Sequence, residues 1–144
     1  MRPRWLAEGV PRAAPLFYLA AEGLRLYWLS SASSEHSRNL ERNSQAALAV
    51  YRPTRDWKKI RGVQMRGTVS VVSQRGLRDD VVKRFQSRFR LDSSLEPAIR
   101  RSKVYCFEPE WIRYIDNSKA FGYQFEVPVR QESGTIGGKP ARRQ

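Results

Sequence analysis

Residues 60–73 constrain the fold most, because apolar and polar side chains alternate along almost the whole segment. The apolar positions are Ile60, Val63, Met65, Val69 and Val71, and the polar positions are Arg61, Gln64, Arg66, Thr68 and Ser70. A two-residue period places the two sets on opposite faces of a β-strand. Gly62 and Gly67 interrupt the pattern, which predicts bulges or bends of the kind that a barrel needs. The segment therefore predicts a long, curved strand.

Other segments predict further strands. Residues 13–20 and 24–29 are apolar runs on either side of Ala21-Glu22-Gly23, which indicates a hairpin with Gly23 able to take a positive φ. Residues 46–51 predict a buried strand that is closed by Pro53. Residues 103–115 predict a last strand, broken at Glu108-Pro109-Glu110 and ended by the turn signal Asp116-Asn117-Ser118.

Two helices are predicted between these strands. Residues 35–43 form a short amphipathic segment, and residues 76–89 carry an apolar side chain at every fourth position, namely Leu77, Val81, Phe85 and Phe89. Residues 91–101, which contain Pro97, are expected to be a connector. Parallel βαβ repeats and the Gly-x-Gly-x-x-Gly pattern are both absent from the sequence, which favours a mainly β, antiparallel barrel decorated by helices.

Size, charge and cysteine content limit the class of protein. The 144 residues suit one domain, expected over residues 1–128, with a disordered basic tail over residues 129–144. No run approaches the roughly 20 apolar residues that cross a bilayer. A single cysteine, Cys106, and a single histidine, His36, exclude an internal disulfide and make a metal site improbable. We expect a soluble cytoplasmic protein without a membrane partner, whose net charge of +13 favours anionic ligands.

A serine cluster follows the second strand of the hairpin. Residues 30–38 contain Ser30, Ser31, Ser33, Ser34, His36 and Arg38 at the start of the first predicted helix. Hydroxyl groups and the unpaired N–H groups of a helix N-terminus together form a site that suits a phosphate. The alternative is that Ser33 or Ser34 simply caps the helix.

The order of these segments carries a resemblance to a known family. The segments are Pro11-Arg12-Ala13-Ala14-Pro15-Leu16-Phe17-Tyr18, Leu26-Tyr27-Trp28-Leu29-Ser30-Ser31, His36-Ser37-Arg38-Asn39-Leu40 with Asn43, residues 46–50, Ile60-Arg61-Gly62-Val63-Gln64-Met65-Arg66-Gly67, and Tyr114-Ile115-Asp116-Asn117-Ser118 followed by Phe121-Gly122. Together they resemble the FMN-binding split-barrel family related to pyridoxamine phosphate oxidase, in an uncharacterised branch. The resemblance covers residues 9–125.

This resemblance implies a six-stranded antiparallel split barrel that forms a homodimer with two FMN sites at its interface. The phosphate is expected beside Ser30, Ser31, Ser34 and His36, and the flavin ring along Pro15, Leu16 and Phe17. The central strand would bring Arg61 and Gln64 toward the ligand, and Asn117 would approach from near the interface. The family's N-terminal helix has no counterpart here, and Trp5-Leu6-Ala7 is expected to be a remnant of the first strand.

Several residues depart from the family pattern or have a simpler interpretation. Characterised oxidases carry Arg or Lys where this chain has Glu35 and His36, and a glutamate repels a phosphate. The Arg and His that bind the substrate of true pyridoxamine phosphate oxidases have no clear match, so that specific activity is not predicted. We expect His36 to be a helix surface residue rather than a haem ligand, and Cys106 to be a small buried hydrophobic residue. We expect Trp28 and Trp111 to be core or dimer-interface aromatics.

Three functions remain open from the sequence. The first is a homodimeric FMN-binding oxidoreductase that acts on an unknown small molecule, in which the flavin supplies the redox chemistry. The second keeps the fold but uses a deazaflavin or haem, or has a lapsed site. The third is a basic OB-like barrel that binds nucleic acid through phosphate contacts and base stacking. It does not explain the serine cluster or the long central strand, so we expect no nucleic-acid partner.

Overall fold

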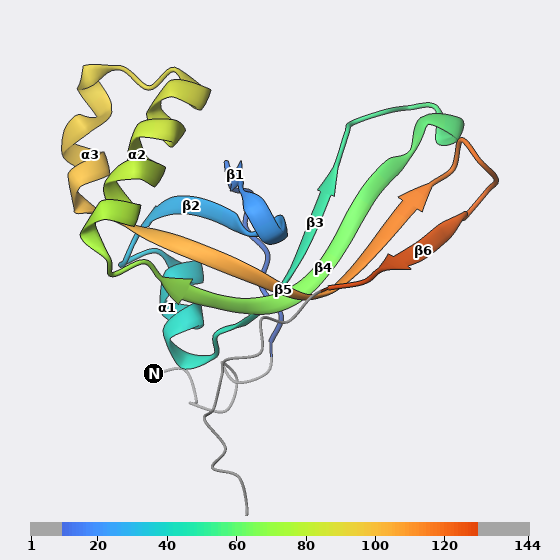
Figure 1. The fold of residues 1–144 in the computed structure, drawn as a ribbon, viewed down its shortest axis with the longest axis horizontal. Coiled ribbons are helices and arrows are strands. Elements are labelled where there is room, and N and C mark those ends of the chain that lie inside the picture. Colours follow the sequence, from blue (N-terminus) through green and yellow to red (C-terminus); the bar gives the residue numbers. More distant parts are fainter. Residues whose placement is uncertain (1–9, 130–144) are drawn as a thin grey trace, which may run out of the picture.

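The computed structural model describes residues 10–129, which form one antiparallel sheet of six strands with three α-helices (Figure 1). The strands are β1 (Leu19–Ala20), β2 (Leu26–Ser31), β3 (Gln45–Tyr51), β4 (Arg61–Val71), β5 (Ser102–Asp116) and β6 (Gln124–Val127). The helices are α1 (Glu35–Arg42), α2 (Arg75–Phe89) and α3 (Glu96–Arg101), with 3-10 turns η2 (Glu22–Leu24), η3 (Trp57–Lys59) and η4 (Ser93–Leu95).

The two long strands β4 and β5 form the backbone of the sheet. They pair from Arg61 opposite Asp116 to Val71 opposite Tyr105, which confirms the long strand predicted from the alternation. On its other edge β5 pairs with β2 along its first half and with β6 along its second half. The sheet therefore divides between β2 and β6, and the two parts spread into the two lobes seen in Figure 1.

Gly67 marks the bulge between the two halves of this strand pair. The register shifts here, because Arg66 pairs with Trp111 whereas Gly67 pairs with Pro109, which leaves Glu110 as the extra residue. A Cβ atom on Gly67 would overlap the carbonyl oxygen of Glu108. The predicted bend at Gly67 is confirmed, whereas Gly62 lies in regular register opposite Ile115. The predicted break at residues 108–110 is a bulge inside a continuous strand.

Two groups of buried side chains hold the sheet to its helices. The larger group contains Leu26, Trp28, Met65, Val69, Tyr105, Phe107 and Ile112, and Phe107 is fully buried. The second lies where α2 covers the other face of the sheet and contains Tyr27, Val81, Val104 and Cys106. Trp28 and Cys106 are core residues, as predicted.

Three predicted elements differ from the structure. Only Leu19 and Ala20 of the predicted strand 13–20 pair with β2, because Pro15 lacks a backbone donor and most of residues 13–18 lie exposed. Strand β3 is an edge strand that alternates between exposed and half-buried residues, so it is not the buried strand that its apolar run predicts. The predicted connector 91–101 contains η4 and α3, since Pro97 occupies the first turn of α3, where it costs no hydrogen bond.

The remaining predictions concern boundaries. Helices α1 and α2 lie within a residue of their predicted limits, Gly23 has a φ of 69°, and the turn after Asp116 is present. Strand β6 was not predicted. Trp5-Leu6-Ala7 and nearly all of the expected tail lie outside the described residues. Within residues 10–129 no helix is long and apolar enough to cross a membrane.

Candidate functional site

The junction of β2 and α1 brings together the serines predicted from the sequence. Ser34 is the N-cap of α1, and its Oγ accepts a hydrogen bond of 3.3 Å from the backbone N–H of Ser37. Ser34 therefore caps the helix, as the simpler interpretation predicts. The same hydroxyl also belongs to a larger polar cluster, so capping does not exhaust its contacts.

Ser30, Ser34 and His36 form this cluster. The Oγ of Ser30 and the Nε2 of His36 are 2.6 Å apart, and the Oγ of Ser34 lies 3.2 Å from the same nitrogen. The two hydroxyl oxygens are 3.3 Å apart. Ser31 pairs instead with Ser33, at 2.8 Å between their hydroxyl oxygens, on the exposed side of the loop. Of the four predicted phosphate ligands, three converge and Ser31 lies beside them.

Arg12 changes the charge at this junction, and sequence reasoning missed it. Its Nε lies 3.2 Å from Oε1 of Glu35, the first residue of α1. The carboxylate that should repel a phosphate is therefore paired with a guanidinium. No sequence spacing could have revealed this pair, because the two residues belong to separate segments that meet only in the folded chain.

The donor set at the junction fits a phosphate group. It comprises the hydroxyl of Ser30, the imidazole of His36 and the N–H groups of the first two residues of α1, which have no acceptor within a helix. The hydroxyl of Ser34 donates to the carbonyl of Ser31 or to Oγ of Ser37, and it would join this set by turning its proton to the ligand. Phosphate oxygens accept hydrogen bonds from all of these groups. Among residues 10–129 no group of three or more His, Cys, Asp or Glu side chains could hold a metal ion.

Residues 15–17, predicted to line the flavin ring, form an extended segment on the surface. Leu16 is half-buried and packs against the larger core group, whereas Pro15 and Phe17 are exposed. The ring of Phe17 lies 5.0 Å from that of Phe89 at the end of α2. This segment has little strand pairing to fix it, so a ligand could contact it without breaking sheet hydrogen bonds.

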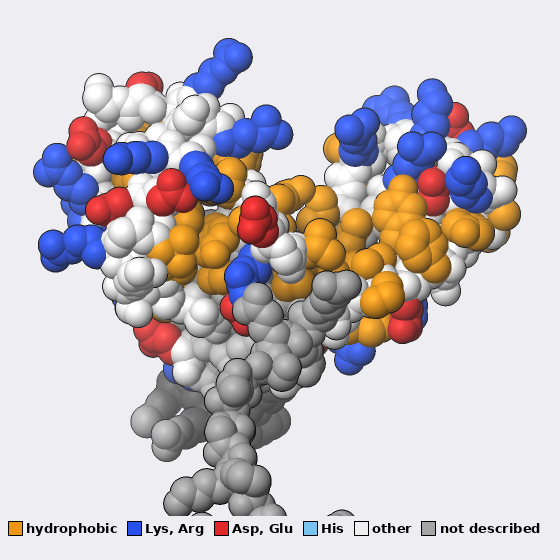
Figure 2. Space-filling view, viewed as in Figure 1, with side chains coloured by type: hydrophobic (Ala, Val, Ile, Leu, Met, Phe, Trp, Pro, Cys, Tyr) orange, Lys and Arg blue, Asp and Glu red, His pale blue; other side chains and the backbone are white. Residues whose placement is uncertain are grey.

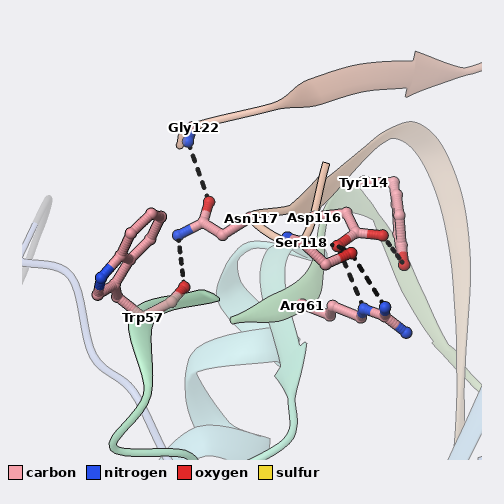
Figure 3. Close-up of polar contacts among 7 residues, drawn as sticks. All are labelled: Trp57, Arg61, Tyr114, Asp116, Asn117, Ser118 and Gly122. Carbon is pink, nitrogen blue, oxygen red and sulfur yellow. Dashed lines mark hydrogen bonds and ion pairs between the residues drawn. The ribbon is translucent and has the colours of Figure 1, made fainter. Parts of the chain in front are cut away.

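Arg61 and Asn117 lie in a separate polar network at the far end of β4 and β5 (Figure 3). Arg61 donates from Nε to Oδ1 of Asp116 at 3.1 Å and from Nη2 to Ser118 at 3.0 Å. Hydrogen bonds from Ser118, followed by the charge of Arg61, lower the pKa of Asp116. Both ends of the Asn117 side chain are engaged, since Nδ2 donates to the carbonyl of Trp57 and Oδ1 accepts from the N–H of Gly122. The contacts of both residues hold the turn together.

Gln64 belongs to the sheet face opposite the larger core group. It pairs with Arg113 in the register of β4 and β5, next to the pair of Arg66 and Trp111. The guanidinium carbons of Arg66 and Arg113 each lie 4.8 Å from the ring centroid of Trp111. Trp111 is therefore a half-exposed residue between two cations and not a core residue of this chain.

The predicted site divides into two parts within one chain. Ser30 pairs with Lys103 near the start of the 15-residue strand β5, whereas Arg61 pairs with Asp116 at its end. An extended strand advances about 3.3 Å per residue, which separates the two parts by roughly 40 Å of strand. This is longer than a flavin nucleotide, so one chain does not bring these residues to one ligand.

An apolar groove lies between the two parts, and sequence reasoning did not find it. It encloses about 300 Å³ and is lined by Leu24, Val63, Met65, Ile112, Tyr114, Phe125 and Val127. Figure 2 shows hydrophobic side chains along the hollow between the lobes and over the adjoining lobe. Most of these residues alternate as core residues do, so their pattern alone could not distinguish an open groove from a filled core.

Comparison with known proteins identifies relatives by family and fold. The model of the family described as Pyridoxamine 5'-phosphate oxidase matches residues 5–116. No curated protein matches the chain significantly. A conserved hypothetical protein of Mycobacterium tuberculosis is 16% identical, with a TM-score of 0.67, over 90% of this chain and 81% of that one.

Two further structures are described by their ligand. A heme binding protein from Mycobacterium smegmatis is 18% identical, with a TM-score of 0.65, over 83% of this chain and 48% of that one. The heme storage protein HutZ from Vibrio cholerae is also 18% identical, with a TM-score of 0.60, over 72% of this chain and 75% of that one. At these identities the similarity demonstrates the split-barrel fold.

Proposed function

The chain belongs to the pyridoxamine 5'-phosphate oxidase family, and we propose that it is a homodimeric FMN-binding protein that holds the flavin phosphate where β2 meets α1. The observation that carries the proposal is the cluster of Ser30, Ser34 and His36 at the first turn of α1, with Glu35 neutralised by Arg12. Hydroxyl and N–H donors at a helix N-terminus match the acceptor oxygens of a phosphate.

The rest of the site requires a second copy of the chain. Arg61 lies at the far end of β5, too distant to meet a ligand held by the same chain's serine cluster. A twofold dimer that sets one chain's far end against the other chain's near end would generate two equivalent composite sites. The open apolar groove gives such a dimer a surface to bury.

FMN, when bound, supplies two-electron redox chemistry to an unknown small molecule. The residues of this chain would bind and orient it. Ser30, Ser34 and His36 would hold the phosphate, and Leu16 and Phe17 offer apolar contact for a flat ring.

The test is a spectrum of the purified protein, followed by titration with FMN and sedimentation analysis. The proposal expects flavin absorbance or saturable FMN binding by a dimer, and weaker binding of riboflavin, which lacks the phosphate. No saturable binding at micromolar FMN, or equal affinity for riboflavin, contradicts it. Parallel titration with a deazaflavin identifies a site that prefers that cofactor.

Haem is a second candidate, favoured by the wholly apolar lining of the groove and by the two heme proteins among the structural neighbours. A haem titration followed by its absorbance distinguishes the two cofactors. Haem coordination by His36 would require Nε2 to leave Ser30, which lies 2.6 Å away. If the protein binds haem but not FMN, and His36→Ala abolishes the haem binding, haem would replace FMN as the proposed cofactor.

A further inference from the structure

One of the two lobes is formed by β3, β6 and the adjoining halves of β4 and β5, and its far end carries aromatic and cationic side chains that the proposed flavin site does not use (Figure 1). This end consists of the connection between β3 and β4 and the turn between β5 and β6, and we call residues 52–60 and 117–123 the tip. Figure 1 shows the two connections side by side, at the end of the lobe remote from α1 and α2. The tip is therefore a protruding surface distinct from the serine cluster.

Asn117 fixes the two halves of the tip to one another. Its backbone N–H donates to the carbonyl of Ile60 at 2.9 Å, and its side-chain Nδ2 donates to the carbonyl of Trp57 at 3.1 Å. Its Oδ1 accepts from the N–H of Gly122 at 3.0 Å, as Figure 3 shows. These bonds give the adjacent aromatic residues fixed positions, so that little conformational freedom is lost when the tip binds a partner.

Two aromatic rings project from this fixed turn. Phe121 is 81% exposed and Trp57 is 49% exposed, and their ring centroids lie 5.8 Å apart in an edge-to-face arrangement. Rings of this size usually bury most of their surface in a core. Their exposure at a protruding surface leaves them free to contact something outside the chain.

Cations surround these rings. The tip contains five basic side chains, Arg52, Arg55, Lys58, Lys59 and Lys119, and one carboxylate, Asp56. Lys59 lies 3.9 Å from Asp56, and Lys58 lies over the ring of Trp57 at 5.7 Å. For Arg52, Arg55 and Lys119 there is no ion pair with any of residues 10–129. Figure 2 shows Lys and Arg side chains gathered at this end of the lobe.

We propose that the tip docks on an anionic lipid bilayer, with Phe121 and Trp57 inserted at the headgroup level and the surrounding cations against lipid phosphates and carboxylates. Aromatic side chains with basic neighbours are the combination that peripheral proteins use at membrane interfaces. This inference rests on a dimer of the proposed kind in which Arg61 reaches the partner's site while Trp57 and Phe121 remain uncovered. It departs from the expectation of no membrane partner, which considered only segments that cross a bilayer.

The geometry favours a lipid surface over single-stranded nucleic acid. Base stacking requires an aromatic face beside a basic groove that follows the phosphate backbone. Here the two rings meet edge to face, Lys58 occupies a face of Trp57, and the surface protrudes. A protruding pair of rings can enter a bilayer interface without a groove.

The charge requirement is tested by co-sedimentation of the full chain with phosphatidylcholine vesicles, with and without phosphatidylserine. Binding is expected only to the anionic vesicles and should weaken as salt increases. Each basic residue near such a surface contributes about fivefold to the partition coefficient, so Arg55→Glu with Lys58→Glu should weaken binding by roughly 25-fold or more. The matched control, Lys83→Glu with Arg88→Glu on α2, changes net charge equally and should retain most of the binding.

The aromatic requirement is tested separately with Phe121→Ala. Its binding to anionic vesicles should fall by about tenfold, because the aromatic surface no longer leaves water. Leu95→Ala removes an apolar side chain that is 43% exposed in the other lobe and should bind like the parent protein. Thermal unfolding of every variant identifies any that fail to fold, and Phe121→Tyr, which keeps the ring, should preserve binding.

Four outcomes would overturn the proposal. The first is that the protein does not bind anionic vesicles, and the second is that tip and control variants lose vesicle binding equally. The third is that the tip binds single-stranded DNA while the protein does not bind vesicles. The fourth is that a tip substitution converts a dimer to a monomer. The last would assign the tip to contacts between copies of the chain. FMN titration of the same variants keeps a failure here distinct from a failure of the flavin site.

Discussion

Ser30, the next-to-last residue of β2, and His36, the second residue of α1, share a hydrogen bond of 2.6 Å. This contact places a hydroxyl and an imidazole beside the first turn of α1, whose N-terminal N–H groups have no helical acceptor. The arrangement resembles a helix cap that has been extended into an anion site. It can be tested without knowledge of the substrate.

Ser30→Ala and His36→Ala should each weaken FMN binding by about tenfold, because each removes one hydrogen bond to a charged phosphate, worth about 1.5 kcal/mol. Titration followed by flavin fluorescence measures the change. Ser87→Ala, an exposed serine on α2, is the matched control and should bind normally. Unchanged affinity in both site variants would place the phosphate elsewhere.

The pair of Arg12 and Glu35 should control the charge of the same site. Glu35→Gln should tighten FMN binding, and Arg12→Ala should weaken it, because each alters the potential at the start of α1. The pair is exposed, so either change should alter the free energy of unfolding by less than about 1 kcal/mol. Binding constants for both single variants and the double variant measure the coupling, and additive effects would show that the pair is not linked.

Gly67→Ala should destabilise the fold by about 3 kcal/mol, because a Cβ atom there would overlap the backbone at Glu108 in the bulge. Gly76→Ala is the matched control, since a Cβ atom there meets nothing within 4 Å and alanine favours the helix. It should leave stability unchanged or slightly raised in urea unfolding. Equal stability of the two variants would argue against the bulge.

Phe85→Ala should cost about 3–5 kcal/mol, because Phe85 is buried and its removal leaves a cavity between α2 and its neighbours. Its ring lies 4.6 Å from that of Phe89, so part of the loss comes from this aromatic contact. Leu77→Ala on the same helix is 38% exposed and should cost less than about 1 kcal/mol. Chemical denaturation of both variants measures the difference.

Asp116 should make stability depend on acidic pH. Its pKa is lowered by hydrogen bonds from Ser118 and by Arg61, so its ionised form stabilises the folded chain above the unfolded-state pKa of about 4. That contribution is lost as the pH falls through the folded-state value. Asp116→Asn should therefore reduce stability at neutral pH and flatten the decline of the melting temperature in acid, whereas Asp79→Asn should retain the parent profile.

Local pattern predicted the elements that depend on neighbouring residues in the sequence. The alternation from Ile60 to Ser73 identified β4, the four-residue spacing from Leu77 to Phe89 identified α2, and the serines before Glu35 identified the start of α1. The cap at Ser34 could be predicted for the same reason, since a capping side chain forms its hydrogen bond within its own turn.

Contacts between distant segments could not be predicted in this way. The segment from Ala13 to Tyr18 has the apolar character of a strand, but a strand also needs a neighbouring strand to pair with, and these residues do not pair with β2. Strand β6 is short, and only pairing with β5 orders it. The pair of Arg12 and Glu35 forms because folding brings an extended segment to α1, and no spacing encodes that approach.

The sequence by itself determined the antiparallel β class, the long central strand and the donor groups at the start of α1, because periodicity and capping act over a few residues. Tertiary structure decided that Arg61 and Asn117 lie at the opposite end of β5 from Ser30, that Arg12 neutralises Glu35, and that Trp57 meets Phe121 on an exposed tip. These relationships depend on strand register and loop approach, which are fixed only when the whole sheet packs.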